Sequence, residues 1–227
     1  MIMREKNTST AKFNMSKEEK LELLLTTIVC LIPVLAGIIL YNKLPEQIAT
    51  HWDANGNVNG ISSRFVGAIV LPVTLVLLNL IYLVILRLDP KYSNMNGKLK
   101  AIMHWIIPFV AIFASGTTLA AGLGMDTHIQ ITGPMLVGLI FILIGNYLPK
   151  TRQSYTMGIK LPWTLRSEEN WNRTHRVAGF IWVLGGFLMI VTVFLPYKEV
   201  IMLVAIAIMV LIPCIYSYSY YRKELRG

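Results

Sequence analysis

Residues whose types could support chemistry gather first in the polar segment 44–60 of this sequence. His51 and Asp53 lie two positions apart and could offer metal ligands, with His128 from a later segment as a third. No established ligand spacing joins these three residues, and turn-forming pairs such as Asn55-Gly56 are typical of a folded loop. We therefore expect a folded polar loop here and no bound metal.

A second polar segment, residues 146–179, holds the nearest approach to an acid–base set, Glu168, Glu169 and His175. Ser167 suits the N-cap of a helix whose first turn carries both glutamates. One face of that helix, continuing into an apolar stretch, is marked by Trp171, His175, Ala178 and Trp182. Motifs of hydrolases, zinc proteases, nucleotide-binding loops and thiol oxidoreductases are missing. We expect a packed, hydrogen-bonded His175, no catalysis and no cofactor.

The elements that must position these two segments are membrane-spanning helices. Charged residues make up 15% of the sequence and apolar residues 55%, whereas a soluble domain carries about 25% charged residues. Six apolar stretches have the length of about 20 residues that a bilayer requires, without the alternation of barrel strands. We expect an all-α integral membrane protein, a bundle of six transmembrane helices. The expected spans are residues 21–41, 66–86, 101–122, 129–148, 176–195 and 199–220.

The distribution of positive charge predicts the orientation. Of the 21 Lys and Arg residues, 18 fall in the two terminal segments and in the loops after the second and fourth spans. By the positive-inside rule both termini lie in the cytoplasm. The net charge of +9 is thereby assigned to juxtamembrane segments that face membrane lipid, and we expect no direct nucleic-acid binding.

These spans predict three parts of the chain. Ser16 and Glu19 form an S-x-x-E capping box, which predicts a helix start near residue 17. The expected division is a cytoplasmic tail at 1–20, a two-span module at 21–90 with an external loop at 42–65, and a four-span module at 91–227 with a cytoplasmic segment at 149–175.

Small and polar residues inside the spans leave alternatives open. Gly116, Ala120 and Gly124 recur every four residues, a face that permits close helix packing within the bundle or, alternatively, in a homo-oligomer. Asn79 and Asn146 suit hydrogen bonds between neighbouring helices. No acidic or basic residue lies in the middle of a span, which argues against a coupled transporter.

Both polar segments carry motifs that resemble those of SdpI-type membrane proteins. The first motif has the form LP-x-x-I-x-x-HW-[DN]-x-x-G, here Leu44, Pro45, Ile48, His51, Trp52, Asp53 and Gly56. The second is the dense run GNYLPK…GIKLPWTLRSEENWNRTHRVAG, which departs from the expected Thr-Pro-Trp by having Leu161. With six spans, the resemblance covers nearly the whole chain from about residue 21.

The resemblance implies a function in the bacterial cell membrane. SdpI-type proteins protect the producer's membrane against an exported toxic peptide, and the best-known member also holds a cytoplasmic repressor at the membrane. The implied toxin-sensing residues outside are Pro45, His51, Trp52, Asp53 and Gly56. The implied signalling or docking residues inside are Asn146, Pro149, Arg152, Tyr155, Gly158, Pro162, Trp163, Glu168, Asn170, Trp171 and His175. A small transporter or channel for a peptide or lipid-like solute is the alternative.

Overall fold

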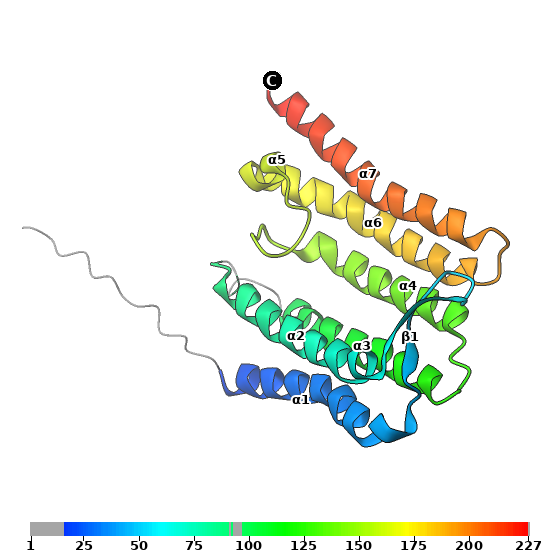
Figure 1. Cartoon of the computed structure of the whole chain (residues 1–227). Coiled ribbons are helices and arrows are strands. Elements are labelled where there is room, and N and C mark those ends of the chain that lie inside the picture. Colours follow the sequence, from blue (N-terminus) through cyan, green and yellow to red (C-terminus); the bar gives the residue numbers. More distant parts are fainter. Residues whose placement is uncertain (1–15, 91, 93–96, 227) are drawn as a thin grey trace, which may run out of the picture.

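Six long helices form the frame of the molecule (Figure 1). The computed structural model describes residues 16–90, 92 and 97–226. The helices are α1 (Lys17–Leu40), α2 (Leu71–Leu88), α3 (Gly97–Gly122), α4 (Ile129–Tyr147), α6 (Glu168–Thr192) and α7 (Lys198–Glu224). All six are long and apolar enough to cross a membrane, which confirms the six expected spans. Of the expected tail, residues 1–15 lie outside the described residues.

The start of α1 follows the predicted capping box. The Glu19 amide donates to the Ser16 hydroxyl at 3.1 Å, and the Ser16 amide donates to the Glu19 carboxylate at 3.2 Å. The same carboxylate lies 3.6 Å from the Arg87 guanidinium and 3.7 Å from the Lys100 ammonium. Glu19 therefore joins the ends of α1, α2 and α3 on one side of the bundle.

The helices pack in two groups, α1–α2–α3 and α4–α6–α7, that lie side by side (Figure 1). Cys30, Val76 and Ala111 bring α1, α2 and α3 together in one buried cluster. The third span thus packs with the first two, while the expected module boundary at residue 91 stays a prediction.

The second group is built on close backbone contact between α4 and α6. A Cβ added to Gly138 would lie 2.6 Å from the Gly186 carbonyl oxygen, and one added to Gly179 would lie 2.7 Å from the Gly145 carbonyl oxygen. Only glycine permits helices to approach this closely.

The expected small-residue face on the third span does not form such a contact. A Cβ added to Gly116 would meet open space within 4 Å. Gly124 lies beyond the end of α3, in a turn with a φ of +78°. The expected close packing of this face within the bundle is therefore wrong. Homo-oligomerisation through the same face stays a prediction.

The expectation of an all-α fold is corrected by a β-hairpin between α1 and α2. Strands β1 (Gln47–Trp52) and β2 (Val58–Ser63) pair antiparallel. In β1 the β-branched residues Ile48 and Thr50 stand at alternate positions, and Ile48 is buried with Leu44, Ala68 and Leu119. This contact fixes the hairpin across one end of α3, which we call the hairpin end of the bundle.

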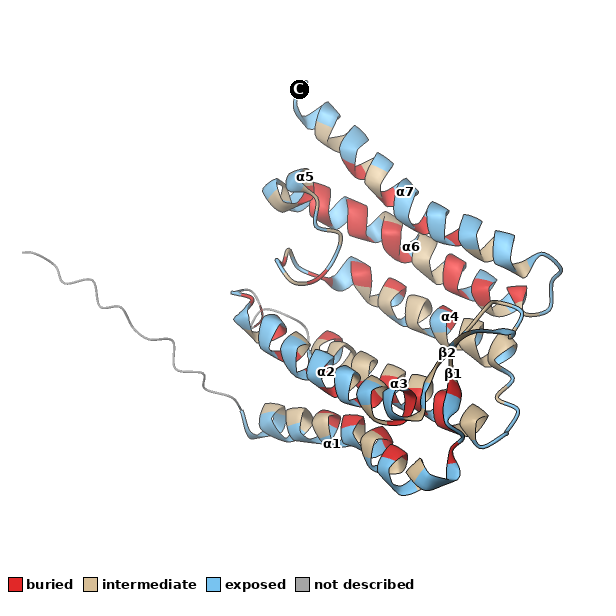
Figure 2. Cartoon of the chain, viewed as in Figure 1, coloured by how far each residue is buried: buried red, intermediate tan, exposed pale blue. Residues whose placement is uncertain are grey.

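Burial is concentrated between the helices, and their outer faces are exposed and apolar (Figure 2). Such faces are typical of helices surrounded by lipid. Inside the first group, the buried Asn79 amide and Ser115 hydroxyl have no hydrogen-bond partner among the residues that the structure describes. The expected bond from Asn79 to a neighbouring helix is therefore not formed.

Candidate functional site

The hairpin turn is organised by Asp53. One oxygen of its carboxylate accepts from the backbone amides of Asn55 and Asn57, both at 2.9 Å, and the other accepts from the Asn57 side chain at 3.0 Å. Gly56 completes the turn with a φ of +86°, a conformation that favours glycine. The hydrogen bonds, above all the one from the Asn57 side chain, lower the pKa of Asp53 below its ordinary value.

The other expected residues of this loop have separate roles. His51 is exposed and pairs across the hairpin with the Asn59 side chain at 2.5 Å. The Pro45 carbonyl accepts from the Arg64 guanidinium at 3.1 Å. His128 lies instead beside Asp126, at 3.3 Å. Within the described ranges, no three His, Cys, Asp or Glu side chains gather as a metal site would require.

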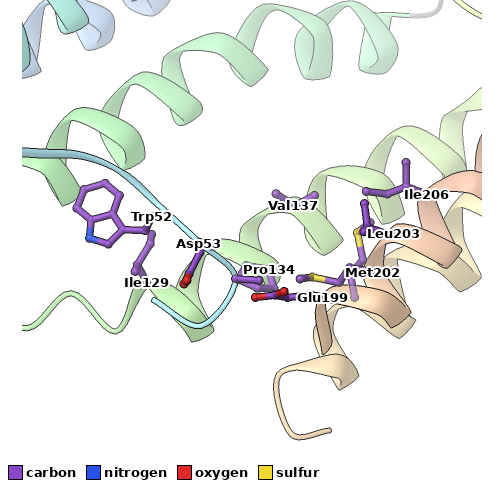
Figure 3. A pocket seen from close by; sticks show the side chains of 12 residues that line it. Trp52, Asp53, Ile129, Pro134, Val137, Glu199, Met202, Leu203 and Ile206 are labelled. Atoms are coloured by element: carbon purple, nitrogen blue, oxygen red, sulfur yellow. The ribbon is translucent and has the colours of Figure 1, made fainter. Parts of the chain in front are cut away.

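A cleft is lined by residues of the hairpin turn and of α4, α6 and α7, and we call it the hairpin cleft (Figure 3). Its volume is about 460 Å³. Side chains that line it include Trp52, Asp53, Val137, Glu199, Met202 and Leu203. The Asn55 side chain donates to the Glu199 carboxylate at 2.7 Å, so the hairpin turn is bonded directly to the first turn of α7.

At the opposite end, residues 148–167 fold onto the start of α6, and we call this segment the connector. It contains a single 3₁₀ turn (Leu148–Lys150) and the short helix α5 (Pro162–Arg166). Helix α6 begins after Ser167, whose hydroxyl accepts from the Asn170 amide at 3.1 Å, and continues as one helix to Thr192. This confirms the expected N-cap and the continuous helix. Glu169 and Arg173 pair at 2.6 Å on its exposed side.

Trp171 and His175 hold the connector on α6. The fully buried Trp171 indole donates to the Thr151 carbonyl at 2.9 Å. Nε2 of His175 accepts from the Ile159 amide at 2.9 Å, so Nδ1 carries the proton and donates to the Trp171 carbonyl at 2.8 Å. The two rings stack with centroids 3.9 Å apart. Both ring nitrogens are occupied, which matches a packed His175 and leaves none for acid–base work.

Gly158 makes this packing possible. Its φ of +95° lies in the left-handed region, and a Cβ at this position would lie 2.7 Å from the Trp171 ring. Glycine is therefore required both for the turn and for the close approach to the two aromatic rings.

A second cluster ties the connector and α6 to the last turns of α7. The Asn170 side chain donates to the Ser217 carbonyl and accepts from the Ser217 hydroxyl, each at 3.1 Å. The Trp163 indole donates to the same hydroxyl at 2.5 Å and stacks on Tyr221. The Ser167 hydroxyl donates to Glu224 at 2.7 Å.

Asp89 joins the connector to α2, and the sequence analysis missed it. One oxygen of this buried carboxylate accepts from the hydroxyls of Ser154 and Thr156, both at 2.5 Å. It also accepts from the backbone amides of Tyr155 and Thr156, at 3.1 and 2.9 Å. Its signal in the sequence is an acidic residue immediately before Pro90, at the end of an apolar run.

The side chains of the other expected residues of this end have different positions. The side chains of Arg152, Tyr155, Glu168 and Asn146 are exposed. Pro149 packs against Gly179 of α6. Pro162 is the first residue of α5, where its missing amide hydrogen costs nothing.

These features define a helical multi-pass membrane protein with a folded connector at one end and a docked hairpin at the other. Comparison with known proteins gives the family. The SdpI/YfhL protein family matches residues 150–217, and a domain of unknown function, DUF1648, matches residues 28–76. The chain is 30% identical to the immunity protein SdpI of Bacillus subtilis (strain 168) over 198 residues, 86% of this chain and 93% of that protein. The chain belongs to the SdpI/YfhL family of membrane proteins. No solved structure matches it.

The two matched regions cover opposite ends of the bundle. The family match covers the connector from residue 150 onward, all of α6 and part of α7, and the DUF1648 match runs from α1 through the hairpin into α2. The similarity to an immunity protein supports an immunity role for this chain.

Proposed function

We propose that this chain is an immunity protein of the bacterial cell membrane that protects against an exported toxic peptide. The proposal rests on the similarity to an immunity protein over most of the chain. In this proposal the hairpin end faces outside and the connector end faces the cytoplasm, with both termini inside. The distribution of charge supports that orientation, since the hairpin end carries only Lys43, Arg64 and Lys198 as basic residues.

The observation that carries a signalling role is the course of α7. Its first turns line the hairpin cleft with Glu199 and Met202. Its last turns are bonded to the connector through Ser217 and Glu224. A ligand that moved one end of α7 would change the contacts at its other end. Such coupling is the minimum that transfer of a signal across a bilayer requires.

We further propose that the exposed side of the connector docks a cytoplasmic repressor. Arg152, Tyr155 and Glu168 are exposed on it. Their mixed charge and aromatic character suits a protein partner. In this proposal Trp171 and His175 do not contact the repressor; they hold the connector in the fold that presents this surface.

Immunity is tested by survival. A sensitive bacterium that expresses the chain is expected to survive at least one secreted membrane-active peptide that kills the same strain with an empty vector. Absence of protection against every peptide of a broad panel, with normal membrane levels of the protein, would contradict the proposal.

The signalling step is tested with Trp163→Phe, which removes the bond to Ser217 and keeps an aromatic ring beside Tyr221. We expect a repressor-controlled reporter to lose its response to the peptide while the protein reaches the membrane normally. Trp105→Phe, at an exposed position of α3, is the matched control. If the reporter responds equally in Trp163→Phe and in Trp105→Phe, the bond between Trp163 and α7 has no part in signalling.

Orientation is tested by labelling with a membrane-impermeant maleimide in intact cells, after replacing Cys30 and Cys214 with serine. A cysteine at Asn57 is expected to be labelled and one at Arg152 is not, although both positions are exposed. The opposite pattern would refute the proposed orientation. The alternative of a small transporter or channel needs a polar path through the midplane, and the apolar floor of the hairpin cleft does not supply one.

A further inference from the structure

The hairpin cleft has the size of a binding site for a few side chains. Its volume of about 460 Å³ lies in the range of about 300–1,000 Å³ that ligand sites occupy. The floor is apolar and comes from three different helices, with Val137 on α4, Met189 on α6 and Met202 on α7. Methionine side chains adapt their shape to different apolar partners, which suits recognition of a peptide.

The charged residues that line the cleft are both acidic. Asp53 and Glu199 stand at the edge next to the hairpin turn (Figure 3). Both carboxylates are hydrogen-bonded to the neutral residues Asn55 and Asn57, so these bonds cancel neither negative charge. An adjoining hollow shares Trp52 with the cleft and adds a third carboxylate, Asp126. This concentration of negative charge occurs in a chain with a net charge of +9.

We infer that the hairpin cleft binds an apolar peptide segment with a positive charge, with apolar side chains in the Val137–Met202 floor and a lysine, arginine or terminal amine at Asp53 and Glu199. The inference rests on the proposed function and names the place where the toxic peptide is engaged. An anionic lipid headgroup is disfavoured at this edge because the carboxylates would repel its phosphate.

The experiment uses the full chain in phosphatidylcholine nanodiscs and two synthetic probes. One is an amphipathic helix of leucine and lysine with a single photoreactive leucine, and the other has glutamate in place of every lysine. We expect the lysine probe to bind at least tenfold more tightly and to crosslink to the hairpin turn and the first turns of α7. Equal affinity of both probes, or crosslinking confined to other surfaces, would overturn the inference.

Two variants locate the binding to the cleft. Met202→Trp fills the floor and is expected to weaken binding of the lysine probe at least tenfold. Glu199→Gln removes one charge and is expected to weaken it about fivefold, as a partly exposed ion pair does. The matched controls are Leu211→Trp on the exposed side of α7 and Glu46→Gln at an exposed position of the hairpin end. Equal effects of variants and controls would refute the site.

Survival assays separate this inference from the proposed function. If the chain protects cells and Met202→Trp protects them equally well at the same membrane level, the cleft is not the site of engagement and the immunity role stands. If the chain protects against no peptide and the probes still bind as expected, the immunity role fails and the cleft stands as a peptide-binding site.

Discussion

Replacing Asp89 with asparagine tests whether one carboxylate fastens the connector to the rest of the bundle. The substitution keeps the size of the side chain and removes its charge. In the native protein a single Asp89 oxygen receives two hydroxyl and two backbone amide hydrogen bonds from Ser154, Tyr155 and Thr156. Hydrogen bonds to a charged group contribute about 1.5–3 kcal/mol each, and bonds to one shared atom do not add fully.

We therefore expect a loss of about 3 kcal/mol in the free energy that keeps the connector closed. Since 1.4 kcal/mol corresponds to a tenfold change in an equilibrium, the open population should rise about a hundredfold. Hydrogen exchange at the Tyr155 and Thr156 amides measures that population directly. Trypsin gives a second measure, because cleavage after the exposed Arg152 and Lys160 requires the connector to unfold locally.

The control is Asp126→Asn, which removes an exposed carboxylate at the hairpin end. It should leave exchange in the connector unchanged. Exchange rates of the Tyr155 and Thr156 amides within threefold of the wild type in Asp89→Asn would refute the reasoning. So would full additivity of Asp89→Asn and Ser154→Ala in a double-mutant cycle, because a shared hydrogen bond must appear as coupling.

Three further perturbations give distinct outcomes. Ser115→Ala should raise the free energy of unfolding in detergent by about 1 kcal/mol, since its buried hydroxyl has no partner among the described residues; a loss of stability would contradict this. Gly158→Ala should lower the melting temperature and reduce the free energy of unfolding by at least about 2 kcal/mol, because the left-handed φ and the contact with Trp171 both oppose a Cβ. An unchanged stability would contradict the close packing of this turn on Trp171. Asp53 has a lowered pKa, so its stabilisation of the hairpin turn should persist above the ordinary value of 3.8 and be lost only as pH falls through the lowered value. An Asn57 amide resonance that titrates at or above pH 3.8 would contradict that assignment.

The helical frame could be predicted from the sequence because each span is a long apolar run with recognisable ends. The capping box at Ser16 and Glu19 and the N-cap at Ser167 depend on residues three positions apart, and both are present in the structure. Local patterns of this kind are complete within one helical turn. They fix where a helix begins whatever the rest of the chain does.

The hairpin and the glycine contacts could not be predicted in the same way. The turn residues near Asn55 were visible, but the strands are short, and Ile48 becomes buried only when the hairpin meets Leu119 of α3. Likewise, the stripe that begins at Gly116 and the glycines of α4 and α6 look alike in sequence. Which of them meets a neighbour depends on the arrangement of whole helices.

The candidate site shows the same limit at single residues. Trp171 and His175 were expected to share a helix face, and they do. Their partners, Thr151 and Ile159, lie 20 and 16 positions away in the sequence, and no local spacing predicts these contacts. Asp89 is bonded to residues more than 60 positions later, so only the folded chain shows its role.

The exposure of α7 has a consequence for the membrane in which the protein works. One side of this helix packs on α6, and most of its remaining surface, including Val210 and Leu211, is apolar and open to lipid. The tilt of a helix covered largely by lipid responds to bilayer thickness. A thinner bilayer would tilt α7 further and move its Glu199 end and its Ser217 end in opposite directions. Lipid composition would then set the resting tilt of the helix that reaches both ends of the molecule. Cells that change their lipids would also change the contacts that α7 makes at each end.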